Sequence, residues 1–190
     1  IGSIGQKQAE ELVKLYGISN EKIFDLPDGV ELEKISVLTS NPTKKRGDLG
    51  LNESDIVLIC VSRLAANKGT QYLIQAMDIL AKRLKNIKLI LVGSGPEEKM
   101  LKNMIEKSNL TGRIRHFKDI GDQELFAYYR LADIFVLTTL YEGLPLVLLE
   151  AAACGLPIIT TDITDNSQIV KNGKNGYLVP AKNATAIADA

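Results

Sequence analysis

Two cations lie five residues apart, directly after an apolar run that has the length of a strand. They are Arg63 and Lys68, and Gly69 follows them. Arginine offers a planar fork of donors and lysine a compact charge, so the two together could neutralise a diphosphate. Two solvated surface charges are the alternative interpretation, and these residues alone leave it open.

A second group of residues surrounds the start of a helix that we predict over 145–154. Gly143 and Pro145 set a tight turn into this helix. The first N–H groups of a helix have no partner within it and form a natural pocket for an anion. Here those groups belong to Leu146 and Val147, because proline has no N–H to donate.

Two glutamates lie on either side of this anion pocket. Glu142 precedes the helix, and Glu150 lies about 7.5 Å further along its axis than Pro145. This spacing fits a nucleotide sugar, with the diphosphate at the helix start, the ribose at Glu150 and the sugar at Glu142. An acid on a helix is usually solvated, but Glu150 is the only charge between Gly143 and Thr161. We therefore expect it on a buried or functional face.

A glycine-rich loop gives a weaker signal. Gly93, Gly95 and Pro96 follow another apolar run. Glycines let a backbone approach a ligand closely at a helix start, but a plain turn explains the same residues. No third glycine completes a dinucleotide-binding motif, so a nicotinamide-binding domain fits poorly.

The elements that must position these residues alternate from residue 56 onward. Apolar runs predict strands, and apolar residues every three or four positions predict helices. The predicted strands cover residues 56–61, 89–92, 114–117, 134–137, 158–160 and 177–179. The predicted helices cover residues 70–85, with Thr70 as N-cap, then a segment opening at Pro96, then 122–130, 145–154 and 166–170. This alternation predicts a doubly wound, Rossmann-like α/β fold with a parallel sheet covered on both faces.

The candidate residues then share one edge of the sheet, since ligands of such sheets bind beyond the carboxyl ends of the strands. We expect one domain over 1–190, with its parallel core over 56–180 and the start of a helix over 181–190. Residues 1–55 should form an entry segment, with a helix over 4–16, a short strand over 22–26 and a loop with a short helix over 38–55.

Composition narrows the function classes. Lysine plus arginine equals aspartate plus glutamate, 23 each, so no overall positive field favours nucleic acid. Cys60 and Cys154 lie in apolar surroundings, which indicates buried free thiols in a reducing compartment and hence a cytoplasmic protein. No apolar run approaches the roughly 20 residues of a membrane span. We interpret His116, the only histidine, as structural.

The motifs resemble the C-terminal domain of retaining glycosyltransferases of family 4, which have the two-domain GT-B fold. The matching stretches are residues 61–64 with Lys68 and Gly69, then 92–96, 131–136, 141–145 and 150–157. The last two carry the family's pair of glutamates, separated by seven residues. The resemblance extends over nearly the whole chain, and it implies an acceptor-binding domain before residue 1. A fragment without that domain should be inactive alone.

The resemblance implies a role for each candidate residue. The chain would bind a nucleotide sugar, UDP- or GDP-linked, and the enzyme would transfer its hexose with retention to a glycan, lipid or other acceptor, as in polysaccharide biosynthesis. The full-length enzyme could be membrane-peripheral. Arg63, Lys68 and Glu142 would be catalytic, and Glu150 would bind the ribose. Diphosphate contacts would come from Arg63, Lys68, Gly143, Leu144, Leu146 and Val147, and nucleobase contacts from Gly93, Lys118 and Ile120.

No cofactor or metal is expected, because the chain contains no Asp-x-Asp motif that could bridge a metal to the diphosphate. Two other functions stay open. One is a nucleotide-sugar epimerase of the same fold, against which the glutamate pair argues. The other is a nucleotide-binding module without chemistry, in which Arg63 and Glu142 would be dispensable.

Overall fold

The computed structural model describes residues 2–3, 6–26, 28–40, 44–163 and 165–190. Its main feature is a six-stranded, wholly parallel sheet with the order β5-β4-β3-β6-β7-β8. The strands are β3 (Ile56–Val61), β4 (Ile87–Val92), β5 (Ile114–Phe117), β6 (Ile134–Leu137), β7 (Ile158–Thr161) and β8 (Gly176–Val179). This order confirms the predicted doubly wound, Rossmann-like fold.

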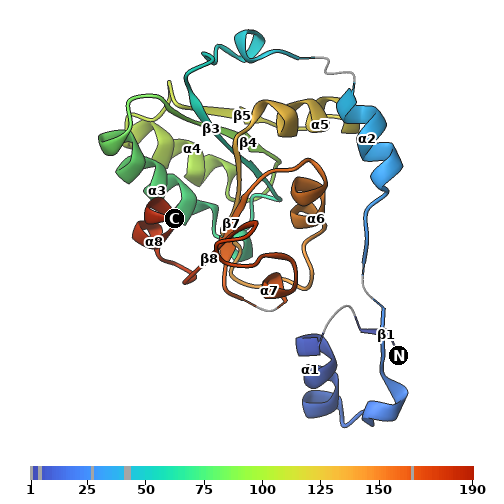
Figure 1. Cartoon of the computed structure of the whole chain (residues 1–190). Helices are drawn as coiled ribbons and strands as arrows, with labels where there is room; N and C mark the ends of the chain where they lie inside the picture. The colour runs from blue at the N-terminus through green and yellow to red at the C-terminus, as the bar shows by residue number, and fades with distance from the viewer. Residues whose placement is uncertain (1, 4–5, 27, 41–43, 164) are drawn as a thin grey trace.

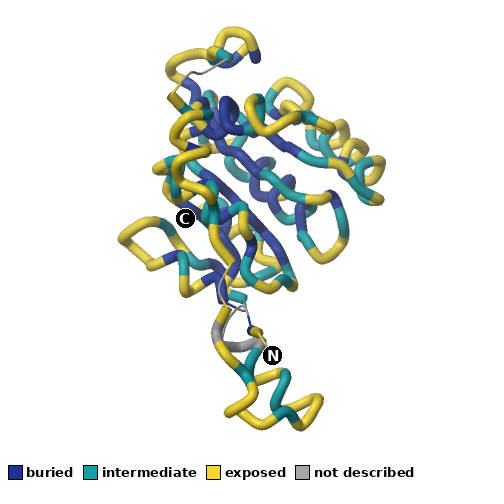
Figure 2. Tube along the Cα trace, turned by 90° about the vertical axis from the view of Figure 1, so that its right-hand side faces the viewer, coloured by how far each residue is buried: buried dark blue, intermediate teal, exposed yellow. Residues whose placement is uncertain are grey.

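Helices cover both faces of the sheet (Figure 1). On one face lie α3 (Thr70–Arg83), α4 (Glu98–Lys107) and α8 (Ala184–Asp189), and on the other α2 (Leu32–Ser40), α5 (Asp122–Leu131) and α6 (Leu146–Ala153). Side chains of β3 alternate between the two cores, with Val57 and Ile59 in one and Leu58 and Cys60 in the other. The central strands are therefore buried on both sides, as Figure 2 shows.

The N-terminal residues form a separate unit. Strand β1 (Gly2–Ser3) pairs in parallel with β2 (Phe24–Asp25), and neither joins the six-stranded sheet. Between them lie α1 (Gln6–Tyr16) and the 3-10 turn η1 (Asn20–Lys22). Figure 1 shows this unit away from the main sheet, connected to α2 by an extended stretch.

Three strands, β3, β5 and β6, have the predicted bounds, while other elements differ. Residues 38–55 were expected to form a loop with one short helix, but the end of α2 occupies residues up to Ser40 and the 3-10 turn η2 covers Arg46–Leu49. Residues 41–43 of this predicted loop lie outside the described residues. Helix α4 begins at Glu98 and not at Pro96, because the Glu97 N–H donates to the Leu64 carbonyl at 2.9 Å.

The prediction of Thr70 as N-cap of α3 is wrong. The cap is Gly69, with φ +61°, and Thr70 is the first helical residue, buried, with no partner for its hydroxyl. A side chain could not replace Gly69, because a Cβ there would lie 2.3 Å from the Thr138 carbonyl oxygen. The close approach of β6 to this turn therefore requires a glycine at the cap.

Two short elements complete the chain. The turn η3 (Ala66–Lys68) precedes α3, and α7 (Asn166–Ile169) follows β7. The two cysteines are free, as predicted; Cys60 is buried, while Cys154 is half-buried and not buried as expected. Burial raises the pKa of the Cys60 thiol to about 12 and that of Cys154 to about 11. Both thiols therefore stay protonated at neutral pH.

Candidate functional site

The candidate residues lie where the winding of the sheet reverses. Strands β3 and β6 are neighbours, but the helices that follow them pack on opposite faces of the sheet. The loops that leave their carboxyl ends, residues 62–69 and 138–145, therefore lead to opposite faces of the sheet, and the crevice that binds ligands in doubly wound folds is expected at such a switch point. This is the usual ligand position in doubly wound sheets.

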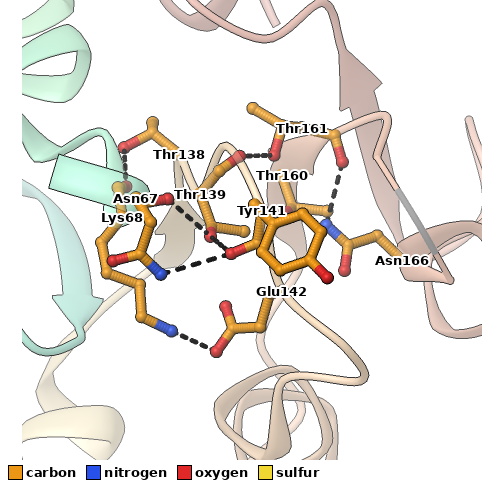
Figure 3. A network of polar contacts seen from close by, with 9 residues as sticks. All are labelled: Asn67, Lys68, Thr138, Thr139, Tyr141, Glu142, Thr160, Thr161 and Asn166. Carbon is orange, nitrogen blue, oxygen red and sulfur yellow. Dashed lines mark hydrogen bonds and ion pairs between the residues drawn. The ribbon is translucent and has the colours of Figure 1, made fainter. Parts of the chain in front are cut away.

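Hydrogen bonds fasten these two loops together at their base. The Asn67 carbonyl accepts from the Leu140 N–H at 2.7 Å and from the Thr139 hydroxyl at 3.1 Å. The Thr138 hydroxyl donates to the Gly69 carbonyl at 3.0 Å. The Asn67 amide donates in turn to the Tyr141 carbonyl at 3.3 Å. The loop after β3 is thus positioned by the loop after β6 (Figure 3).

Lys68 and Glu142 form an ion pair across this junction. The Lys68 ammonium donates to Glu142 Oε1, and Figure 3 shows the two side chains facing each other. Both are largely withdrawn from solvent, with side chains 17% and 22% exposed. The second oxygen, Oε2 of Glu142, is buried without a partner among the described residues. A buried carboxylate oxygen without a donor is uncommon in folded proteins and indicates a position for a ligand or water.

The other predicted diphosphate contacts border this pair. Arg63 follows β3 and is exposed, and its guanidinium has no ion-pair or hydrogen-bond partner within the described part of the chain. Gly143 and Leu144 lie between Glu142 and the start of α6. Because an exposed guanidinium can turn in any direction, the structure gives Arg63 a place beside the crevice but no fixed geometry.

Helix α6 begins one residue after the predicted start. Pro145 is its N-cap, and Leu146 and Val147 are its first two residues. Their N–H groups have no carbonyl one turn earlier in the helix to which they could donate. The positive end of the helix therefore opens beside Glu142.

Glu150 is half-buried and faces α5. Its Oε2 accepts a hydrogen bond from the hydroxyl of Tyr129 at 2.9 Å. The sequence predicted a buried or functional face for Glu150, and the structure leaves it half-buried against the buried Tyr129. It does not bring Glu150 into contact with Lys68 or Glu142, whose described partners are each other.

The glycine-rich loop after β4 packs directly on the loop after β3. Gly93 has φ +133°, and a Cβ on it would lie 1.9 Å from the Ser62 carbonyl oxygen. A Cβ on Gly95 would lie 2.3 Å from the Leu64 carbonyl oxygen. The glycines are thus needed for close packing of two loops within the chain.

Two of the three predicted nucleobase residues, Lys118 and Ile120, follow β5, which lies two strands from β3. Lys118 follows β5 and pairs with Glu98 at 3.0 Å, and Ile120 is half-buried and packs against the core. His116 Nε2 lies 2.7 Å from the Gly93 carbonyl oxygen, a contact that fits the structural role expected for it. The structure does not bring Lys118 or Ile120 into contact with the Lys68–Glu142 pair.

A buried polar network beneath the crevice was missed from the sequence. The Thr161 hydroxyl donates to the Thr139 carbonyl at 2.5 Å, and Asn166 Nδ2 donates to the Thr161 carbonyl at 2.9 Å and to Thr160 Oγ1 at 3.2 Å (Figure 3). The signal for it is the pair of threonines that ends each of two adjacent apolar strands. This network fixes the ends of β6 and β7, and through Thr139 the position of Asn67, the residue before Lys68.

No described helix is long and apolar enough to cross a membrane. No group of three or more His, Cys, Asp and Glu side chains is arranged within the described residues to hold a metal ion.

A doubly wound parallel sheet with charged loops at its switch point defines a Rossmann-like α/β protein. The chain belongs to the glycosyl transferases group 1, whose family model matches residues 41–190. It is 32% identical over 187 residues to a D-inositol 3-phosphate glycosyltransferase of Paenarthrobacter aurescens, covering 96% of this chain and 45% of that protein. A GDP-mannose-dependent phosphatidylinositol monomannoside mannosyltransferase of Mycolicibacterium smegmatis is 30% identical, covering 87% and 45%.

Solved structures give the same fold. The crystal structure of HepE from Anabaena in complex with UDP matches with a TM-score of 0.85 and 21% identity, over 99% of this chain and 51% of that one. WaaG, a glycosyltransferase involved in lipopolysaccharide biosynthesis, matches with a TM-score of 0.83 and 21% identity, over 99% and 51%. The chain thus spans about half the length of these relatives.

Proposed function

We propose that this chain is the C-terminal, donor-binding domain of a retaining family 4 glycosyltransferase. It binds a nucleoside diphosphate sugar at the carboxyl edge of its sheet. The whole protein transfers the hexose to a glycan, lipid or other acceptor, which a preceding domain holds. Family membership supports this proposal, as do relatives whose names specify glycosyl transfer and a related fold solved with UDP-glucose.

The observation that carries the proposal is the Lys68–Glu142 pair at the switch point. The pair places a cation and an acid side by side at a helix start, with one buried carboxylate oxygen unsatisfied. A sugar hydroxyl would donate to that oxygen, and a diphosphate would accept from Lys68 and from the N–H groups of Leu146 and Val147. A single nucleotide sugar satisfies all of these groups.

The same residues suit the chemistry of transfer. As the bond between the sugar and the diphosphate breaks, negative charge grows on the departing phosphate and positive charge on the sugar. The negative charge on the phosphate is stabilised by Arg63, Lys68 and the helix start. The positive charge on the sugar develops near the Glu142 carboxylate. Gly143 and Leu144 complete the wall beside the diphosphate, and Glu150 accepts from the ribose hydroxyls.

The nucleobase would lie over the ends of β4 and β5, against Gly93, Lys118 and Ile120. UDP and GDP are the candidate nucleotides, since one related structure holds UDP and one relative depends on GDP-mannose by name. We place the enzyme in the cytoplasm. If its acceptor is a lipid, that acceptor lies at a membrane surface.

Donor binding requires no metal in this proposal, because cationic side chains take its place on the diphosphate. Titration calorimetry with UDP and GDP should give the same affinity with and without EDTA. A binding signal that EDTA abolishes and added Mg²⁺ or Mn²⁺ restores would contradict this.

A thermal-shift panel tests the function as a whole. UDP, GDP, ADP and their sugars are each added to the protein at rising concentration. One nucleotide at about 100-fold above its Kd should raise Tm by roughly 5–10 °C by mass action. The Lys68→Met variant should lose about half of that shift or more, which separates the proposed site from non-specific binding. The absence of a shift with every nucleotide would overturn the proposal.

A further inference from the structure

Tyr129 is a buried ionisable side chain next to Glu150, an acid of the proposed site. It lies on α5, is 0% exposed, and has ring centroids 5.6 Å from Phe126 and 5.8 Å from Phe135. Aromatic packing on both sides fixes the ring, because a close-packed core leaves it no other rotamer. Its hydroxyl is therefore held at one point between α5 and α6.

The hydroxyl at that point contacts a carboxylate of a different helix. It donates to Glu150 Oε2 at 2.9 Å, while Glu150 Oε1 has no hydrogen-bond partner among the described residues. Burial, with the Glu150 charge as a second cause, raises the pKa of Tyr129 far above its usual range. The hydroxyl thus stays protonated and can only donate toward Glu150.

We propose, on the basis of the proposed function, that Tyr129 is a positioning residue that aims Glu150 at the ribose of the nucleotide. A glutamate has three side-chain torsions, and holding it in one geometry costs conformational entropy at each binding event. Anchoring Oε2 removes this cost in advance and leaves Oε1 to accept from the ribose hydroxyls. Tyr129 touches no part of the ligand and acts only through Glu150.

The neighbouring tyrosine provides a matched control. Tyr128 lies on the same helix, is 1% exposed, and donates its hydroxyl to Glu124 Oε1 at 2.5 Å. Tyr128→Phe and Tyr129→Phe therefore delete the same atom from a buried ring that contacts a glutamate. Only Tyr129→Phe releases an acid of the proposed site. A general loss of packing would instead affect both variants alike, so a difference between them reports on Glu150.

The test is calorimetric binding of UDP and GDP, each beside its 2′,3′-dideoxy counterpart. Tyr129→Phe should weaken binding of the ribonucleotide about tenfold, the usual size of a lost hydrogen bond to a charged group. It should leave the affinity for the dideoxynucleotide unchanged, since that ligand has no hydroxyl for Glu150. Tyr128→Phe should change neither affinity. Thermal unfolding of each variant reports whether it folds.

A second pair of variants tests whether Tyr129 acts through Glu150. In a Glu150→Ala protein, Tyr129→Phe should cause no additional loss of ribonucleotide affinity. Three outcomes would each overturn this inference but not the proposed function. They are an unchanged ribonucleotide affinity in Tyr129→Phe, an equal loss of affinity for the ribonucleotide and the dideoxynucleotide, and a further loss of ribonucleotide affinity in the Glu150→Ala background. Failure of the unchanged protein to bind any nucleoside diphosphate would overturn the proposed function, and this inference with it.

Discussion

Lys68 and Glu142 lie 74 positions apart in the chain, yet their side chains form an ion pair with little exposure to solvent. The pair connects the two halves of the sheet at the point where the strand order reverses. It also offsets much of the ammonium charge that would attract a diphosphate, while two of the three N–H donors stay available. Ligand binding and this internal contact are therefore competitors.

Removing the competing charge should favour nucleotide binding. We expect Glu142→Gln to tighten UDP or GDP binding by about two- to fivefold, the size of a modest ion pair. Lys68→Met should weaken it by about tenfold or more, because a hydrogen bond to a charged phosphate is lost. Calorimetric titration with UDP or GDP, which carry no hexose, measures both changes in affinity. Equal weakening by the two substitutions would contradict competition between the pair and the phosphate.

Arg63 should act on turnover. Its guanidinium is exposed and without a described partner, so its removal costs the fold little. In the whole enzyme, Arg63→Ala should lower kcat/KM by about one to two orders of magnitude, since hydrogen bonds to charged groups contribute roughly 1.5–3 kcal/mol. The control is Arg130→Ala, which alters an exposed arginine on α5. Unchanged turnover in Arg63→Ala would remove Arg63 from the site.

Gly93 should tolerate no side chain. Alanine would require an unfavourable φ of +133° and would place its Cβ 1.9 Å from the Ser62 carbonyl oxygen. We expect Gly93→Ala to lower the free energy of unfolding by about 2–4 kcal/mol. Gly112→Ala, whose Cβ meets nothing within 4 Å, should change it by less than about 0.5 kcal/mol. Urea denaturation compares the two, and similar midpoints would refute the argument.

Alkaline pH should destabilise the fold through Cys60. Burial raises its pKa from an ordinary value of 9.0 to about 12, so the folded state keeps a proton that the unfolded chain releases. The stability that comes from the neutral thiol is complete below pH 9 and is lost as pH rises toward 12. Each such group contributes at most about 1.4 kcal/mol per pH unit. Cys60→Ala should flatten the pH dependence of urea unfolding between pH 9 and 11. An equally steep decline in that variant would exclude Cys60 as its source.

The sequence predicts the sheet well because the strands are buried on both faces. Continuous apolar runs such as residues 56–61 and 134–137 have few other interpretations, and their bounds agree with β3 and β6. Helix α2 was missed because only Ile35 among its residues is buried, so its sequence carries little amphipathic pattern. The Thr70 cap was wrong because a contact with the distant Thr138 carbonyl decides the geometry.

The site was predictable to the extent that it rests on charged side chains at strand ends. Lys68 and Glu142 could be placed together because both follow strands that are adjacent at a switch point. The contacts of the Asn67 carbonyl and of the Tyr129 hydroxyl could not be predicted from the sequence. Every residue has a backbone carbonyl, and a tyrosine in an apolar helix face resembles any other core residue. Contacts between side chains of different helices require the three-dimensional packing.

The central position of β3 has a consequence for how the chain is made. Its Val57 N–H donates to Asp133 Oδ2, 76 positions later, and β6 pairs along the same side. At about 5–20 residues per second, a ribosome needs roughly 4–15 s to deliver that partner. During this interval β3, an apolar strand, has one edge without its partner. We therefore expect the yield of folded protein in cells to depend on chaperones more than the stability of the folded state would suggest.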